Sequence, residues 1–224
     1  MNSQISFKKY LLICSIGFGI GGMIWGGWLF KIVSHNKDYL MTPFLLQTSL
    51  IVGLMGGLAL AWFSNNIKYI IKNGLLGMIG FIIGGMVGSF ITYFIFIIST
   101  TSLRVITRFF ATDVDVNNFL NFKSTLLVGD IWLSFCIAGF IIGAFYALGL
   151  KTKIWPMVWR GGIGFGLGSL LGPIIGNLFG NLFNSLLASY LIAFAVIGAI
   201  LGLFLAWGAY INIKNQKSKL QTKI

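Results

Sequence analysis

Apolar residues dominate six long stretches of the chain, and polar residues gather in the short segments between them. The six apolar runs cover about residues 10–30, 44–63, 74–99, 126–149, 157–179 and 188–210. A helix needs about 20 mainly apolar residues to cross the hydrocarbon core of a bilayer, and each run reaches that length. The pattern therefore predicts an all-α, polytopic membrane protein with six transmembrane helices.

The first apolar run follows Lys8 and Lys9, an arrangement that a cleavable signal peptide also has. The apolar region of a signal peptide has about 7–15 residues, which is shorter than this run. We therefore interpret the first run as a retained transmembrane helix.

Glycines recur in register along alternate runs. In the first, third and fifth runs a glycine is followed by phenylalanine, and a second glycine comes four residues after the first. The aligned glycines of the odd runs are Gly17, Gly21, Gly80, Gly84, Gly164 and Gly168, with Gly172 continuing the fifth run, and those of the even runs are Gly53, Gly57, Gly139, Gly143, Gly198 and Gly202.

This register predicts an internal repeat of three tandem helical hairpins, at about 1–70, 71–153 and 154–213, followed by a basic tail at 214–224. The alternative is chance alignment among helices that share a glycine-rich composition. Glycines four residues apart form a flat groove that lets two helices approach closely in lipid. We therefore predict that the aligned glycines pack helices together as a glycine zipper.

Composition excludes a water-soluble fold. Only 9% of the residues are charged and 57% are hydrophobic, whereas a soluble domain carries about a quarter charged residues. The formal net charge is +12, but the basic residues lie in short segments between apolar runs. We interpret them as determinants of membrane orientation and as contacts for anionic lipid headgroups, and we expect no nucleic-acid partner.

The distribution of basic residues predicts an orientation. Two lysines precede the first run, two lie between the second and third, three basic residues lie between the fourth run and the first turn of the fifth, and four follow the sixth, which places 11 of the 16 on one side. The positive-inside rule then predicts that both termini are cytoplasmic. The expected location is the cytoplasmic (inner) membrane of a prokaryote, with an organellar membrane as the alternative.

Asp130 is the acidic residue nearest to an apolar run, and Ser134 follows it by one helical turn. We interpret Asp130 as the N-cap of the fourth helix, where a carboxylate accepts backbone N–H bonds. The alternative is a buried proton or cation site with Ser134 as its partner, because intramembrane acids tend to be functional.

The fifth run carries the other candidates for a solute pathway. Arg160 either extends to the headgroups or binds an anionic lipid or substrate group. Pro173 predicts a kink, which makes this helix the hypothetical moving element. Asn177 and Asn181 share a face with Asn184, and we interpret them as interhelical hydrogen-bonding groups or a solvated helix end, with a permeation path as the alternative.

The polar segment at 100–124 differs from the other connections. Arg104 and Arg108 lie four residues apart among apolar residues at helical spacing. This spacing predicts a short interfacial helix on the outer leaflet. Asp113 and Asp115 follow, and we interpret them as part of a solvated turn.

The chain offers little for catalysis or metal binding. It contains no glutamate, one histidine (His35) and two cysteines (Cys14 and Cys136) that lie in different apolar runs. No nucleophile or phosphate-loop motif is present, so we expect no enzymatic activity, no metal and no cofactor. The partners that we expect are the lipid bilayer and either a membrane-protein partner or a second copy of the chain.

Two functional classes remain. The first is a small transporter or transporter subunit that moves a small or hydrophobic solute, which six spans and internal repeats favour. The alternative is a non-catalytic structural or assembly subunit that packs against larger membrane-protein partners through its glycine faces.

Overall fold

The fold is seen in a computed structural model, which describes residues 6–34, 41–62, 64, 66–110 and 116–221. Within these ranges the side chains are described except at 32–33, 41–49, 92, 96, 99–110, 116–131 and 212–221.

The described residues form six helices and no strand, as predicted. The helices are α1 (Phe7–Ser34), α2 (Met41–Ala61), α3 (Ile67–Phe110), α4 (Val116–Leu150), α5 (Ile154–Leu182) and α6 (Leu186–Gln221). Segments of five of them are long and apolar enough to cross a membrane: Phe7–Lys31, Ile67–Ile95, Trp132–Leu150, Ile154–Leu182 and Leu186–Ile211. In α2 the described side chains begin at Leu50, and they form the apolar segment Leu50–Ala61. The chain is therefore an all-α, polytopic membrane protein.

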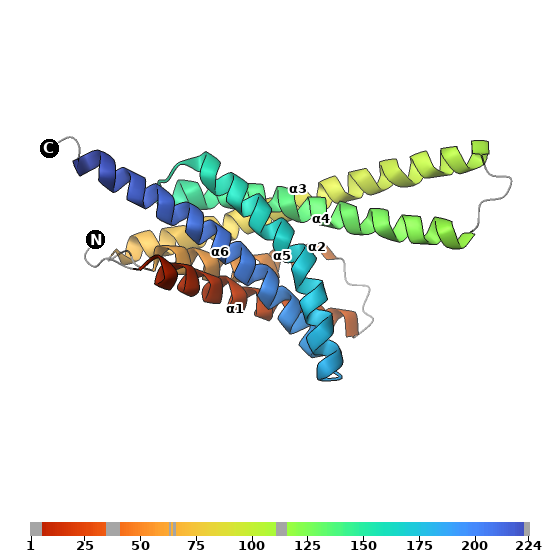
Figure 1. Ribbon diagram of the computed structural model, residues 1–224, viewed down its shortest axis with the longest axis horizontal. Helices are drawn as coiled ribbons and strands as arrows, with labels where there is room; N and C mark the ends of the chain where they lie inside the picture. The colour runs from red at the N-terminus through yellow and green to blue at the C-terminus, as the bar shows by residue number, and fades with distance from the viewer. Residues whose placement is uncertain (1–5, 35–40, 63, 65, 111–115, 222–224) are drawn as a thin grey trace.

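Two helices extend far beyond the bilayer segment at one end of the molecule. The 44 residues of α3 make a helix of about 66 Å, about twice the thickness of a hydrocarbon core. Figure 1 shows the far ends of α3 and α4 running on together past the other four helices as a two-helix arm.

The prediction of a separate, short interfacial helix within 100–124 is therefore wrong. Arg104 and Arg108 belong to α3, which continues to Phe110, and α4 begins at Val116. Residues 89–110 contain no glycine or proline that would end a helix at the bilayer boundary. Asp113 and Asp115 lie outside the described residues. Residues 209–221 likewise contain no glycine or proline, and the predicted tail at 214–224 continues α6 as helix up to Gln221.

The helices form a closed ring in which spatial order follows chain order. Each helix packs against its neighbours in the sequence, and α6 packs against α1 to close the ring. The beginning of α1 and the end of α6 lie at the same end of the molecule (Figure 1). Which side of the membrane this end faces stays a prediction.

Within each hairpin the aligned glycines of the odd helix meet equivalent positions of the even helix. A methyl group added to the first glycine would lie 2.5–2.8 Å from the Cβ of its partner, so only glycine permits this separation. The facing pairs are Gly17–Ala59, Gly80–Phe145 and Gly164–Phe204, and one turn further along Gly21–Val52, Gly84–Ala138 and Gly168–Ile197, while Gly172 meets Ala193.

Between hairpins the aligned glycines of each even helix meet the backbone of an odd helix. The pairs are Gly53–Gly77 and Gly57–Asn73 for α2 and α3, Gly139–Gly161 and Gly143–Met157 for α4 and α5, and Gly198–Phe18 and Gly202–Cys14 for α6 and α1. The first two junctions have the same register in the predicted alignment. The third junction is displaced by one helical turn. Cys14 is the counterpart of Gly77 and Gly161 in the alignment, but Gly198 meets Phe18, four residues further along α1. The internal repeat stays a prediction. These contacts agree with it, because aligned glycines of different hairpins contact equivalent residues.

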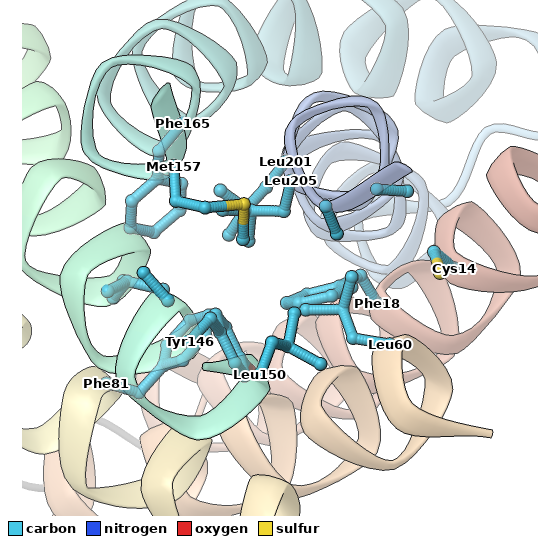
Figure 2. Packing of buried hydrophobic residues seen from close by; sticks show 14 of the residues in the cluster. Cys14, Phe18, Leu60, Phe81, Tyr146, Leu150, Met157, Phe165, Leu201 and Leu205 are labelled. Carbon is cyan, nitrogen blue, oxygen red and sulfur yellow. The ribbon is translucent and has the colours of Figure 1, made fainter. Parts of the chain in front are cut away.

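The centre of the ring is filled by side chains from every helix (Figure 2). The three phenylalanines that follow the first aligned glycines, Phe18, Phe81 and Phe165, are at most 4% exposed. Their ring centroids lie 6.4 Å apart for Phe18–Phe81 and 6.1 Å apart for Phe81–Phe165. Each lies within three residues of the middle of its membrane segment. The phenylalanines therefore form an apolar layer near the middle of the membrane.

The layers between these phenylalanines and the chain ends are tightly packed. Tyr146 is fully buried, and its hydroxyl donates a hydrogen bond of 2.9 Å to the carbonyl oxygen of Gly53. Met157, Leu201 and Leu205 are also fully buried in this core (Figure 2). Cys14 and Cys136 are free, buried thiols on helices that are not neighbours in the ring.

Candidate functional site

A pocket of about 140 Å³ lies inside the ring, beyond the phenylalanine layer and on the side away from the chain ends. Four helices contribute to it, so it belongs to the centre of the ring rather than to a single hairpin. Its lining residues are Trp25 from α1, Phe81, Gly85 and Ser89 from α3, Ser134, Phe135, Ala138 and Ile142 from α4, and Phe165 from α5.

Helical spacing places these residues. Phe81, Gly85 and Ser89 follow one another at intervals of four on α3 and therefore share one face of that helix. On α4 the same spacing aligns Ser134 and Ala138. Because position 85 carries no side chain, the face of α3 is hollowed between the phenylalanine and the serine.

Aromatic rings form the floor and one wall of the pocket. Phe165 packs edge-to-face against Phe81, with centroids 6.1 Å apart, and against Phe135, with centroids 4.8 Å apart. Each edge-to-face pair contributes about 0.5–1.5 kcal/mol beyond the area that it buries, so this floor is held in place. Across the pocket the indole of Trp25 packs against Phe194 of α6, with centroids 4.7 Å apart.

The polar groups of the pocket are few and uncharged. Ser89 and Ser134 contribute hydroxyls, and none of the lining residues is acidic, basic or histidine. The indole nitrogen of Trp25 is buried and has no hydrogen-bond partner in the described part of the chain. The described side chains of the site can therefore exchange hydrogen bonds with a neutral molecule, and none of them is charged.

Of the residues predicted from the sequence as pathway candidates, Ser134 lines the pocket. Asp130 lies inside α4, one turn before Ser134, and its side chain is outside the described residues. The interpretation of Asp130 as an N-cap is wrong, because α4 begins at Val116. The apolar run marks where the helix enters the membrane, whereas the helix itself starts in the polar segment before it.

Arg160 lies near the beginning of α5, on the opposite side of Phe165 from the pocket. Its Nη1 donates a hydrogen bond of 3.3 Å to the carbonyl oxygen of Pro156, and its guanidinium carbon lies 5.0 Å from the ring centroid of Trp207. A cation over an indole face is an attractive contact, which holds this side chain along α6. Arg160 is therefore not a pocket residue.

The remaining candidates on α5 also lie outside the pocket. The helix runs through Pro173 to Leu182, and Pro173 and Asn181 are exposed. The side-chain oxygen of Asn177 accepts a hydrogen bond of 3.1 Å from the hydroxyl of Ser189 on α6. Asn177 thus makes an interhelical hydrogen bond, as the sequence predicted for the amide stripe.

Sequence reasoning missed Trp25 and Ser89. The tryptophans concentrate near the ends of the apolar runs, which favours their interpretation as headgroup anchors. However, Trp25 follows Phe18 by seven residues, which is two helical turns and the same helix face. A search for polar or aromatic residues on the face of each Gly-Phe step could have found both residues.

No protein-family model, curated protein or solved structure matches this chain. The assignment of a function therefore depends on the geometry of the ring and its pocket.

Proposed function

We propose that this chain is a small membrane transporter, or the membrane subunit of one, that moves a small or hydrophobic solute. The observation that carries the proposal is the pocket inside the ring, closed at its floor by Phe81 and Phe165 near the middle of their membrane segments. Transporters commonly hold their substrate near the bilayer midplane, between structural repeats.

The phenylalanine layer supports a transport role because an apolar constriction is a barrier to water and ions. A solute in the pocket has an apolar layer below it and can cross only if the helices that carry Phe18, Phe81 and Phe165 separate. The small number of polar groups fits a hydrophobic solute, which needs few hydrogen bonds to leave the lipid.

The alternative, an assembly subunit that binds partners through glycine faces, is less well supported. The aligned glycines lie against other helices of the same chain, so their flat surfaces are already occupied. The outer surface carries large apolar side chains such as Phe90 and Leu178, which are 70% and 65% exposed. Such a surface is what lipid contact requires.

Uptake into proteoliposomes tests the proposal. Labelled nicotinamide, an uncharged ring compound, is offered to liposomes that contain the wild-type protein or Gly85→Leu, which places a side chain in the pocket. We expect uptake above that of empty liposomes with the wild type and its loss in Gly85→Leu. Leu178→Phe on the lipid-facing side of α5 is the control and should transport like the wild type.

Purification in mild detergent separates the two functional classes. A monodisperse protein whose melting temperature rises with added solute supports the transporter. A stable larger complex, together with equal uptake by wild type, Gly85→Leu and empty liposomes, would show that the chain is an assembly subunit.

A further inference from the structure

We propose that the pocket binds an uncharged molecule with a single aromatic ring and one polar edge, and that Ser89 and Ser134 hydrogen-bond that edge. The inference rests on the proposed function in one respect, since it takes the pocket to be the solute site. It adds the chemical class of the solute and the residues that select it.

The size of the pocket limits the ligand to about one ring. Its volume of about 140 Å³ is close to that of an engineered apolar cavity of about 150 Å³ that binds benzene. A fused polycyclic molecule exceeds this volume, and the floor residues Phe81 and Phe165, which are at most 4% exposed and hold each other edge-to-face, leave no space for it on their side.

The shape of the walls favours a flat ligand. Phe81, Phe135 and Phe165 present ring edges and faces from three different helices, and Trp25 lies across from them on a fourth. A planar ring between these side chains gains edge-to-face and offset contacts that an aliphatic chain of the same volume does not make.

The lining also selects for the charge of the ligand. No residue of the described lining is ionisable, and the floor lies near the middle of the membrane segments, where an unpaired charge is costly. Aromatic rings alone can attract an organic cation, but a buried cation needs a paired anion to offset its lost hydration. The described lining therefore favours a neutral ligand.

The two hydroxyls lie at one wall of the pocket. Gly88, the residue before Ser89, is so close to α4 that a methyl group added there would lie 2.9 Å from the carbonyl oxygen of Ser134 and 3.0 Å from its Oγ. Ser89 and Ser134 therefore line the pocket from neighbouring helices, close to where α3 and α4 touch. A hydroxyl can donate and accept, so a carboxamide or a similar edge with both functions suits the pair.

A charge series of equal size tests the ligand class. Binding of benzamide, benzoate and benzamidinium to the purified wild-type protein is measured by calorimetry, with the heat of empty micelles subtracted. We expect benzamide to bind at least ten times more tightly than either ion. Equal or tighter binding of benzoate or benzamidinium, or no benzamide binding at millimolar concentration, would overturn the proposal.

Variants test the residue assignment. The double variant Ser89→Ala, Ser134→Ala should bind benzamide about tenfold more weakly, which corresponds to the loss of one or two net hydrogen bonds. Ser169→Ala is the matched control, because the Ser169 hydroxyl donates to the carbonyl oxygen of Gly166 at 2.7 Å, within α5 and outside the pocket. Its affinity should equal that of the wild type.

Melting temperatures of the unliganded variants show whether they fold. A double variant that folds and binds benzamide like the wild type would refute the role of the two serines. If benzamide binds but nicotinamide uptake is absent, the ligand class stands and the transport proposal fails. If uptake occurs and benzamide does not bind, the ligand class fails and transport stands.

Discussion

Neighbouring glycines on α3 have opposite effects on the packing around them. A methyl group on Gly84 would lie 2.9 Å from the carbonyl oxygen of Ala138, so this glycine allows α4 to approach. Gly85 lines the pocket, where the missing side chain leaves room for a ligand. At the scale of the residue, the effect of a glycine on packing therefore depends on what lies opposite its helix face. The sequence alone does not show which face meets another helix and which meets the pocket.

Replacement of Gly84 or Gly168 by leucine should destabilise the protein by about 3 kcal/mol each, because the new side chain forces two backbones apart. At both positions an added methyl group would lie 2.9 Å from a carbonyl oxygen of the facing helix. The expected result is a lower melting temperature in detergent. Gly19→Ala is the control, since its nearest contact is an ordinary 3.5 Å. Unchanged melting of both leucine variants would refute the close-packing account.

Tyr146→Phe should cost about 1 kcal/mol of stability, because it removes the buried hydrogen bond to the Gly53 carbonyl and leaves that oxygen without this donor. Unfolding in a denaturing detergent measures the difference. Tyr93→Phe provides the comparison, since Tyr93 is 65% exposed, and its stability should match that of the wild type. A loss of equal size in both variants would assign the effect to tyrosine in general.

At the scale of the element, the apolar runs located each helix but not its ends. The runs at 74–99 and 126–149 lie inside α3 and α4, which extend to Phe110 and back to Val116. An apolar run ends where lipid ends, whereas a helix ends where a breaker or a competing hydrogen bond stops it. This difference explains why the interfacial helix and the Asp130 cap could not be predicted correctly.

Spin labels can verify the arm formed by α3 and α4. A label at Ile106→Cys should be accessible to a water-soluble nickel reagent, because Ile106 lies about 17 Å along α3 past Ile95. A label at Phe90→Cys should be accessible to oxygen instead, because Phe90 lies within the membrane segment. Both labels are attached in a background without Cys14 and Cys136. Strong oxygen accessibility at position 106 would place that residue inside the lipid bilayer and would contradict the arm.

At the scale of the whole molecule, the closure of the ring decides where the site lies. The register of the glycines predicts which residues face a neighbouring helix, but not that α6 packs against α1. The pocket draws residues from four helices, and of its lining only Ser134 is predicted from the sequence. Long-range helix order is set by packing of all six helices together, which no local pattern contains.

The orientation of the ring is a whole-molecule prediction as well. Since α1 begins and α6 ends at the same end of the molecule, both termini should lie on one side of the membrane. The excess of basic residues predicts that this side is cytoplasmic. A fluorescent protein fused to either terminus should therefore fluoresce, and alkaline phosphatase fused there should be inactive. An active phosphatase at either terminus would contradict the orientation.

The displaced junction between α6 and α1 has a consequence for stoichiometry. Gly22 and Gly26 are the counterparts on α1 of Gly85 and Ser89 on α3, yet both lie against the backbone of α6, at Phe194 and Tyr190. A ring with true rotational symmetry would surround all three counterpart positions alike and would offer either three identical sites or one on its axis. In this ring α6 and α1 are displaced by one helical turn, which breaks the symmetry at that junction. The site described on α3 therefore has no copy on α1. On α5 the counterpart positions are Ser169 and Pro173, which lie outside the pocket, so a titration should saturate at one ligand per chain.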